Sequence, residues 1–211
     1  MKYIYITLSV VIFSLLLPDN NKKYYITDVD IVAKLNADGS MDVTENRTYK
    51  FKGKFKYAFQ ELVKSEGIRY DNISVSESGS RYALSEERDA GTFEITDEDS
   101  YINVRWNFKA KDVSRTFTLE YTIHNVVERY NDASILYHKF IGDQWSKEQK
   151  NITIKILPPD SIYKDDLRAW IYGPLWAEYQ VNSDGSIEAW CENLPKKSFF
   201  EVKSVYPQSL F

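Results

Sequence analysis

The chain has 211 residues, of which 43% are hydrophobic and 27% charged, and its formal net charge is −4. These proportions are ordinary for a folded globular protein, and the net negative charge argues against a nucleic-acid partner. The single cysteine, Cys191, excludes an internal disulfide and a cysteine-rich metal site. A buried, inert thiol is expected there, and the fold must depend on the packing of its core.

Residues 1–20 predict a signal peptide or an N-terminal anchor. One lysine precedes an apolar run over residues 4–17, and Pro18, Asp19 and Asn20 stop it. As a helix the run would span only about 20 Å, short of the roughly 30 Å hydrocarbon core, and no small-residue cleavage pair follows it. A cleaved signal, an uncleaved anchor and a first core strand are the alternatives. The first two place the protein outside the cytoplasm, secreted or on the cell surface.

Alternating apolar and polar residues predict strands in the first half of the remaining chain. A strand over 25–35 and its return over 41–52 flank an Asp38-Gly39 turn, which suits a tight hairpin. Residues 55–63 fit either a helical stripe or a bent strand. A short strand at 73–75 precedes a polar excursion over 76–91, in which we expect Tyr82 and Leu84 to touch the core.

The middle of the chain gives the clearest strand pattern. Apolar residues alternate strictly with polar ones over residues 101–108 and 116–123. We expect these two strands to pair and to bury one face. Their inward residues predict the main core, made of Trp106, Phe108, Phe117, Leu119 and Tyr121.

The last third predicts further strands at 152–156, 175–181, 186–191 and 199–206, with a short helix within 161–170. The chain is therefore expected to be all-β, an antiparallel β-sandwich with at most one or two short helices. The extracytoplasmic β domain would cover residues 24–211, with a candidate subdivision near 158–163. Similar segments at 36–42 and 182–188 fit either two related β halves or convergence on favourable turn chemistry.

Glu45 and Arg47 are the most unusual residues of the second strand. They share their side of the strand with Met41, Val43, Tyr49 and Phe51, whereas the other side is wholly polar. A carboxylate among core residues must be paired or hydrogen-bonded. The pattern predicts an ion pair at the core margin or, as the sharper hypothesis, a polar binding pocket.

A second candidate binding region lies within residues 130–145, a loop-like stretch rich in aromatic residues. It contains Asp132, Tyr137, His138 and Trp145. Aromatic rings beside carboxylates bind sugars and peptides, but they also close the ends of sandwiches. Neither a catalytic residue, a metal site nor a cofactor is predicted, because the chain lacks the spacings that zinc, nucleophile and phosphate sites use.

Several segments, in order, resemble the predicted-membrane-protein family called domain of unknown function 2207. They are residues 38–45, 115–123, 130–132, 136–145, 157–158, 172–176 and 206–207. The chain departs from that pattern at Gln60, where an Arg is expected, and at His138, where a Trp is usual. It also ends at Phe211, about where a membrane segment is expected. The resemblance implies a signal peptide, an extracytoplasmic β domain and membrane helices after it, and it implies no activity.

The sequence favours a cell-envelope binding or interaction module, whose partner is an envelope protein or a glycan. Its membrane link would be the N-terminal anchor or a missing C-terminal segment. The alternatives are an envelope enzyme that acts on glycans with Glu45 and Asp132, and a purely structural ectodomain. An enzyme should place two carboxylates in one cleft, whereas a module should show a continuous aromatic surface.

Overall fold

The computed structural model describes residues 22–211, so the predicted N-terminal segment lies outside the described residues. Strands dominate this part of the chain. The first nine are β1 (Lys23–Leu35), β2 (Met41–Lys52), β3 (Lys54–Val63), β4 (Arg69–Glu77), β5 (Ser80–Arg81), β6 (Ala83–Leu84), β7 (Thr92–Asp97), β8 (Tyr101–Lys111) and β9 (Ser114–His124). The others are β10 (Val127–Arg129), β11 (Ala133–Ile141), β12 (Gln149–Leu157), β13 (Arg168–Tyr172), β14 (Glu178–Val181), β15 (Ile187–Leu194) and β16 (Phe200–Pro207), with 3-10 turns η1 (Lys164–Asp166) and η2 (Gln208–Leu210).

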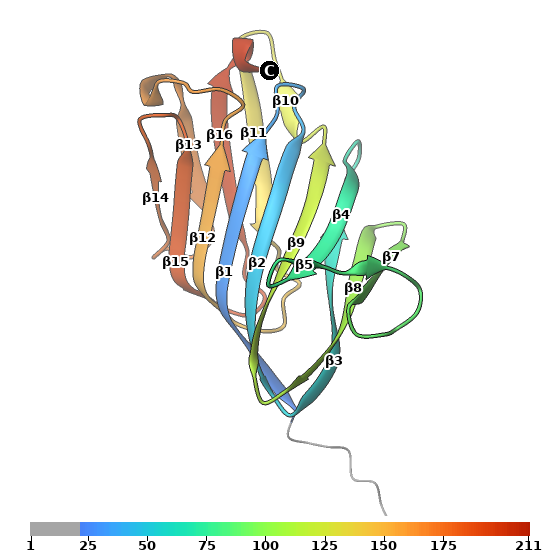
Figure 1. Ribbon diagram of the computed structural model, residues 1–211. Coiled ribbons are helices and arrows are strands. Elements are labelled where there is room, and N and C mark those ends of the chain that lie inside the picture. The colour runs from blue at the N-terminus through green and yellow to red at the C-terminus, as the bar shows by residue number, and fades with distance from the viewer. Residues whose placement is uncertain (1–21) are drawn as a thin grey trace, which may run out of the picture.

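The strands form one large sheet and two small ones. The large sheet has the order β14-β15-β12-β1-β2-β9-β4-β5. The β11 sheet has the order β10-β11-β16-β13, and the β8 sheet has the order β3-β8-β7-β6. In Figure 1 the two small sheets lie behind different halves of the large sheet. The all-β sandwich is therefore confirmed, with mostly antiparallel pairing and parallel pairs at β1–β12 and β6–β7.

One face of the large sheet forms the floor of the core, because every second residue of its central strands is apolar. On β1 these residues are Ile31, Ala33 and Leu35, and on β12 they are Ile154 and Ile156. The residues predicted for the main core are all buried: Trp106, Phe108, Phe117, Leu119 and Tyr121. Cys191 is also buried, and burial raises the pKa of its thiol to about 11, as expected for an inert thiol.

The expected pairing of the two middle strands is wrong. β8 pairs with β3 and β7, whereas β9 pairs with β2 and β4, so the two strands lie in different sheets. The chain turns from one sheet to the other at Asp112, whose φ is 52°. The rings of Phe108 and Phe117 then meet across the layers, with centroids 4.7 Å apart. Their strict alternation reflects two facing sheets rather than two neighbouring strands.

Other segments also differ from expectation. Residues 55–63 form the strand β3, which is one of the two alternatives, whereas the loop-like stretch at 130–145 contains the strand β11. The last part of 175–181 forms β14, which begins only at Glu178, and the short helix is the single 3-10 turn η1. Tyr82 packs against the core, but Leu84 is exposed. Within residues 22–211, no helix is long and apolar enough to cross a membrane.

The two similar sequence segments form the same turn. In the β1–β2 hairpin, Ser40 donates its backbone N–H to Asp38 Oδ1 at 2.9 Å, and in the β14–β15 hairpin Ser186 donates to Asp184 Oδ1 at 3.0 Å. The serine hydroxyls bond the same carboxylates, which lowers the pKa of both Asp38 and Asp184. Both turns lie in the large sheet, and each joins neighbouring strands.

Candidate functional site

Glu45 and Arg47 form a buried ion pair on the inner face of β2. Arg47 donates from Nη2 to Glu45 Oε2 at 2.8 Å and from Nε to the same oxygen at 3.1 Å. Only 1% of Glu45 and 3% of Arg47 is exposed. Since i and i+2 residues share one strand face, β2 alone brings these side chains together.

The carboxylate of Glu45 receives further donors from two other strands. Gln60 on β3 donates its amide to Oε2 at 3.0 Å and to Oε1 at 3.2 Å. The hydroxyl of Tyr121 on β9 donates to Oε1. Gln60 thus occupies the space between the β8 sheet and the large sheet and satisfies the buried charge without adding another one.

Arg47 has its own partners on the other side. Its Nη1 donates to Gln149 Oε1 at the start of β12, and its guanidinium lies over the ring of Trp145, 4.5 Å from the centroid. Trp145 belongs to the segment between β11 and β12. The Glu45–Arg47 network therefore connects β2, β3, β9 and β12 with the loop that leaves the β11 sheet.

Burial and the charge of Glu45 raise the pKa of two tyrosines beside the network. Burial and then the Glu45 carboxylate raise the pKa of Tyr121 well above its usual value of 10.0. Burial followed by Glu45 raises the pKa of Tyr70 to about 12. Both hydroxyls therefore stay protonated at neutral pH, and Tyr121 serves as a permanent donor to the carboxylate.

The cavity beside this network is too small for an organic ligand. Its volume is about 10 Å³, and Glu45, Arg47, Gln60, Tyr49 and Trp106 contribute to its walls. One water molecule needs at least that much space, so a sugar or a peptide side chain is excluded. Within the described chain, the buried Tyr49 hydroxyl and the Trp106 indole N–H have no hydrogen-bond partner.

The structure brings together only some of the six predicted binding residues. Trp145 joins Glu45 and Arg47, and His138 faces inward on β11, where its ring meets Phe140 with centroids 4.8 Å apart. Burial lowers the pKa of His138 to about 4, although the Glu45 charge acts in the opposite direction. His138 is therefore neutral at physiological pH.

Tyr137 and Asp132 lie elsewhere. Tyr137 points to the outer face of the β11 sheet, and Asp132 is exposed in the turn between β10 and β11. Glu45 is sealed in the middle of the large sheet, opposite Ile31 and Leu119. The two carboxylates of the enzyme hypothesis are therefore not placed in one cleft. In the described chain, no group of three or more His, Cys, Asp or Glu side chains could hold a metal ion.

The outer face of the β11 sheet carries an exposed aromatic surface that sequence reasoning found only in part. Tyr137 and Trp170 flank Lys203 in register, and Tyr172 lies beside Glu201 on the next row. The rings of Tyr137 and Tyr172 are 5.8 Å apart, and Tyr137 donates its hydroxyl to Glu201 at 2.8 Å. We call Tyr137, Trp170 and Tyr172 the aromatic face.

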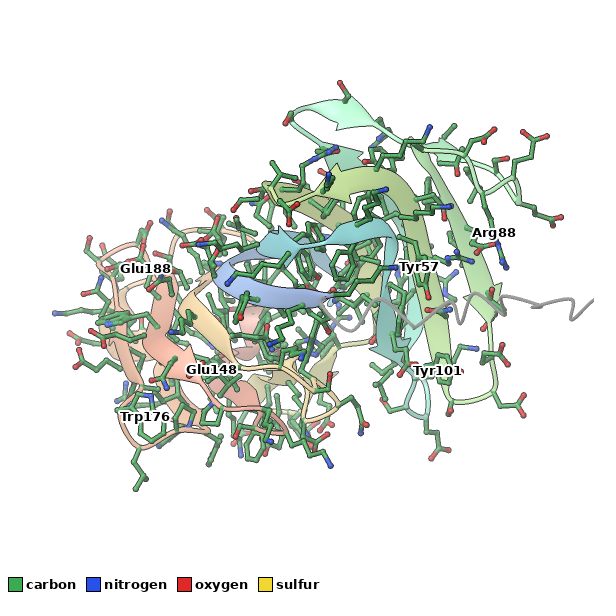
Figure 2. The ribbon with its side chains drawn as sticks, turned by 90° about the horizontal axis from the view of Figure 1, so that it is seen from below. Tyr57, Arg88, Tyr101, Glu148, Trp176 and Glu188 are labelled. Atoms are coloured by element: carbon green, nitrogen blue, oxygen red, sulfur yellow. The ribbon has the colours of Figure 1, made fainter. Side chains whose placement is uncertain are left out.

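The loop after β13 carries two further exposed apolar residues, Leu175 and Trp176. Leu175 at its tip is 100% exposed, and Trp176 donates its indole N–H to the Asn193 carbonyl at 2.9 Å. Figure 2 shows Trp176 at one margin of the molecule, opposite the β8 sheet that carries Tyr57 and Tyr101. Gly173 allows a close approach at the loop's start, where a Cβ would lie 2.6 Å from the Phe199 carbonyl oxygen.

Sequence reasoning missed Gln149 and the role of Tyr121 because neither follows from local pattern. Asn151, whose φ is 46°, breaks the alternation of buried and exposed residues within β12, between Gln149 and the apolar residues that follow. Tyr121 looked like an ordinary core residue. Gln60 did carry a signal, because it departs from the family pattern.

Solved structures with a similar fold come from different proteins. One, described as nutrient-binding, from Legionella pneumophila, has a TM-score of 0.54 and 7% identity over 86% of this chain and 66% of its own. Native leukotriene A4 hydrolase from Saccharomyces cerevisiae has a TM-score of 0.52 and 11% identity over 86% of this chain and 29% of its own. A variant of the M1 zinc metallopeptidase from Deinococcus radiodurans has a TM-score of 0.50 and 10% identity over 85% of this chain.

These likenesses show a shared fold alone, because the identities are so low. The chain spans about two fifths, 42%, of the Deinococcus peptidase. No curated protein sequence matches this chain. The model of the predicted membrane protein (DUF2207) N-terminal domain matches residues 25–206, nearly the whole of the described part. The chain therefore belongs to the DUF2207 family, and these residues form its N-terminal domain.

Proposed function

We propose that this domain is an extracytoplasmic interaction module of a membrane-associated protein and that it binds an envelope glycan through the aromatic face. The family places the chain among predicted membrane proteins. The apolar run at residues 4–17 supports export or anchoring. The proposal rests on the positions of Tyr137, Trp170 and Tyr172. They lie on β11 and β13, and charged residues of β16 lie between these two strands.

The arrangement suits a sugar chain. Aromatic rings offer flat apolar area and lose little conformational freedom on binding. Lys203 lies between Tyr137 and Trp170, and Glu201 lies between Lys139 and Tyr172. Such alternation provides ring faces for the apolar side of a sugar and charged groups for its hydroxyls.

The buried ion pair supports the aromatic face as the binding site, because the pair itself is not accessible to a ligand. Glu45 and Arg47 have their hydrogen bonds satisfied within the protein, and the adjoining cavity of about 10 Å³ admits no substrate. Buried charges with complete partner sets serve the fold. The contact with a ligand then falls to the exposed face.

The test measures binding of the full chain to purified peptidoglycan by cosedimentation and to soluble N-acetylglucosamine oligomers by calorimetry. Trp170→Ala should weaken binding roughly tenfold, the usual effect of truncating an aromatic residue at the centre of an interface. Tyr172→Ala should act in the same direction. Both side chains are exposed, so the folded state should be retained.

Phe59→Ala is the matched control, because Phe59 is an exposed aromatic residue on the β8 sheet, away from the aromatic face. It should leave binding unchanged. Glycan binding that survives Trp170→Ala and Tyr172→Ala together would move the site elsewhere. An absence of any glycan binding by the wild-type chain would refute the glycan as partner.

A further inference from the structure

One end of the molecule gathers exposed lysines from three separate chain segments. The start of β1, the corner between β2 and β3, and the corner between β8 and β9 meet there, at the lower end of Figure 1. Gly53 and Asp112 shape the corners, since Gly53 donates its N–H to Asp112 Oδ1 at 2.8 Å. We call this region the lysine end and define it by Lys23, Lys50, Lys52, Lys54 and Lys111, all exposed.

Four of these lysines lie directly opposite one another in pairs. Lys23 faces Lys52 across β1 and β2, and Lys54 faces Lys111 across β3 and β8. Like charges at opposed positions of an antiparallel pair destabilise a sheet. Two such pairs at one end of a chain with a net charge of −4 are unfavourable for the fold alone.

The protein itself does not neutralise this charge. Within residues 22–211, the lysines that lie within 4.0 Å of a carboxylate oxygen are Lys64, Lys139 and Lys155, none of which belongs to the lysine end. The one acidic residue that lines the adjoining depression is Asp112, and it already caps Gly53. Asp112 contributes one negative charge beside five lysines, so the lysine end keeps a net positive charge.

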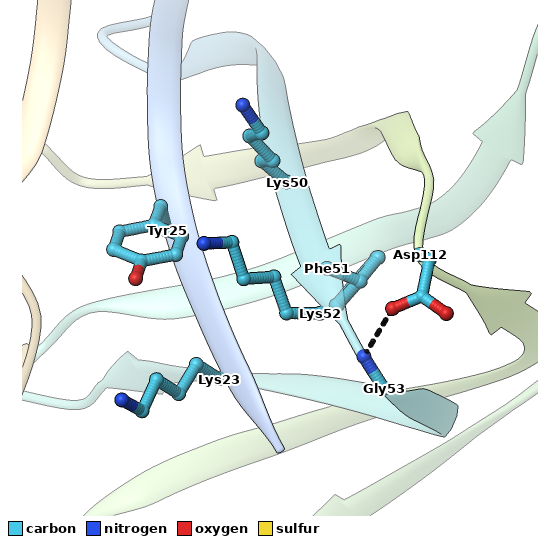
Figure 3. Close-up of a pocket in the computed structure, with 7 residues that line it drawn as sticks. All are labelled: Lys23, Tyr25, Lys50, Phe51, Lys52, Gly53 and Asp112. Atoms are coloured by element: carbon cyan, nitrogen blue, oxygen red, sulfur yellow. Dashed lines mark hydrogen bonds between the residues drawn. The ribbon is translucent and has the colours of Figure 1, made fainter. Parts of the chain in front are cut away.

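Apolar groups accompany the lysines. An open depression of about 720 Å³ is lined by Lys23, Tyr25, Lys50, Phe51 and Lys52, together with Gly53 and Asp112. Figure 3 shows Lys52 reaching toward Tyr25, and its ammonium lies 5.6 Å from the centroid of that ring. Val113 is exposed at the neighbouring corner. Tyrosines and lysines together are typical of the boundary between a lipid bilayer and water.

We propose that the lysine end docks on the anionic head groups of a membrane surface. The anion is a lipid phosphate, because the lysines occupy an open end rather than an enclosed pocket. In the sequence, only residues 18–21 separate Lys22 from the apolar run at 4–17. Four extended residues reach at most roughly 14 Å, less than two Debye lengths of about 8 Å at physiological salt. A retained run would therefore hold the lysine end at the surface.

The docking also fixes an orientation. β1 runs away from the lysine end, and Figure 1 shows the C-terminus at the opposite end of the molecule. The strands of the sandwich would stand upright on the membrane. This inference is separate from the glycan proposal, because the two surfaces share no residue.

The experiment maps lysine accessibility in the full chain. The protein is reconstituted with phosphatidylcholine vesicles or with vesicles that also contain phosphatidylglycerol, and amine acetylation is followed residue by residue by mass spectrometry. Acetylation of Lys23, Lys52, Lys54 and Lys111 should slow about fivefold in the anionic vesicles, the factor expected from one lysine–lipid interaction. High salt should abolish the protection. Lys34 and Lys164, outside the lysine end, are internal controls.

A triple variant, Lys52→Gln with Lys54→Gln and Lys111→Gln, tests whether the lysines of the lysine end bind the membrane surface together. Lys23 and Lys50 should then lose their protection, while a control variant at the other end of the strands, Lys34→Gln with Lys164→Gln, should keep it. The triple variant removes like-charge pairs, so it should fold at least as well as the wild type. Equal protection in both kinds of vesicle would overturn the proposal. So would equal protection by free glycerol phosphate without vesicles, which would indicate a small-anion site.

Discussion

At the scale of single residues, Glu45 and Arg47 are the costliest groups in the core. Removing two charges from water costs several kcal/mol per ion, and only complete pairing offsets it. Here Gln60, Tyr121 and Gln149 complete the pairing from three strands. The role of the pair is therefore structural: it holds the sheets in one arrangement.

Glu45→Gln should destabilise the protein by about 3–5 kcal/mol, because it leaves the Arg47 charge buried without its counter-ion. Chemical denaturation measures the loss. Glu61→Gln on β3 is the control, since Glu61 is exposed and its loss should change stability by less than about 0.5 kcal/mol. Wild-type melting behaviour of Glu45→Gln would show that the buried pair does not stabilise the fold.

His138 should make stability depend on pH. Its pKa is lowered from 6.5 to about 4 by burial, so the folded state binds the proton more weakly than the unfolded chain does. The stabilisation is complete above pH 6.5 and is lost as the pH falls toward 4. The difference in unfolding free energy between wild type and His138→Gln should therefore shrink over that range. A difference that stays constant from pH 7 to pH 4 would contradict the burial of the neutral ring.

At the scale of elements, the two Asp-Gly-Ser turns share hydrogen bonds but differ in surroundings. Gly39 and Gly185 have φ of 83° and 79°, in the region that glycine favours. A Cβ on Gly39 would meet Arg129 Nη2 at 3.4 Å, whereas one on Gly185 would meet Ile162 Cγ1 at 2.4 Å. The same local sequence therefore carries different tertiary constraints.

Gly39→Ala should cost about 1–2 kcal/mol for the left-handed backbone alone. Gly185→Ala should cost about 1–3 kcal/mol more, because Ile162 must move. Thermal and urea unfolding of both variants provide the comparison. In an Ile162→Ala background the extra cost at Gly185 should shrink but not vanish, because the backbone oxygen of residue 162 would still lie 3.1 Å from the added Cβ. Equal costs of the two glycine variants in the wild-type background would show that Ile162 moves away without loss of stability.

At the scale of the whole molecule, three sheets share one core without a disulfide. The rings of Trp106 in the β8 sheet and Phe117 in the large sheet lie 5.7 Å apart, and Phe51 and Phe108 also meet, at 5.3 Å. Such contacts couple the small sheet to the large one. A single cooperative unfolding transition is expected from this coupling.

Trp106→Ala should lower the free energy of unfolding by roughly 3–5 kcal/mol, the range for truncating a large core side chain. Trp176→Ala is the comparison, since Trp176 is half exposed and should cost less than about 1.5 kcal/mol through its one hydrogen bond. Denaturation followed by circular dichroism measures both. A loss under about 1 kcal/mol for Trp106→Ala would show that the β8 sheet does not pack on the large sheet as described.

Local pattern predicted much of this protein. Period-two alternation gave β1, β2, β8 and β9 and directed Glu45 and Arg47 toward the core, because a strand's faces are set by its own residues. It failed for β11, for which the pattern predicted a loop, and for β13, whose first residues lay in a predicted short helix over 161–170. In β11 and β13 the outward-facing residues include aromatic ones. These strands therefore lack the regular alternation of apolar and polar residues that identifies a strand in the sequence.

The sequence by itself determined the all-β class, the inward direction of Glu45 and Arg47 and the main core residues, since side-chain chemistry and strand period are local properties. Only the tertiary structure decided that β8 and β9 lie in facing sheets, because a single corner at Asp112 changes the partners of a whole strand. It also decided which distant residues satisfy Glu45 and Arg47, and it assembled the lysine end from three segments. Contacts between residues far apart in sequence depend on how the sheets pack, and no local pattern encodes that packing.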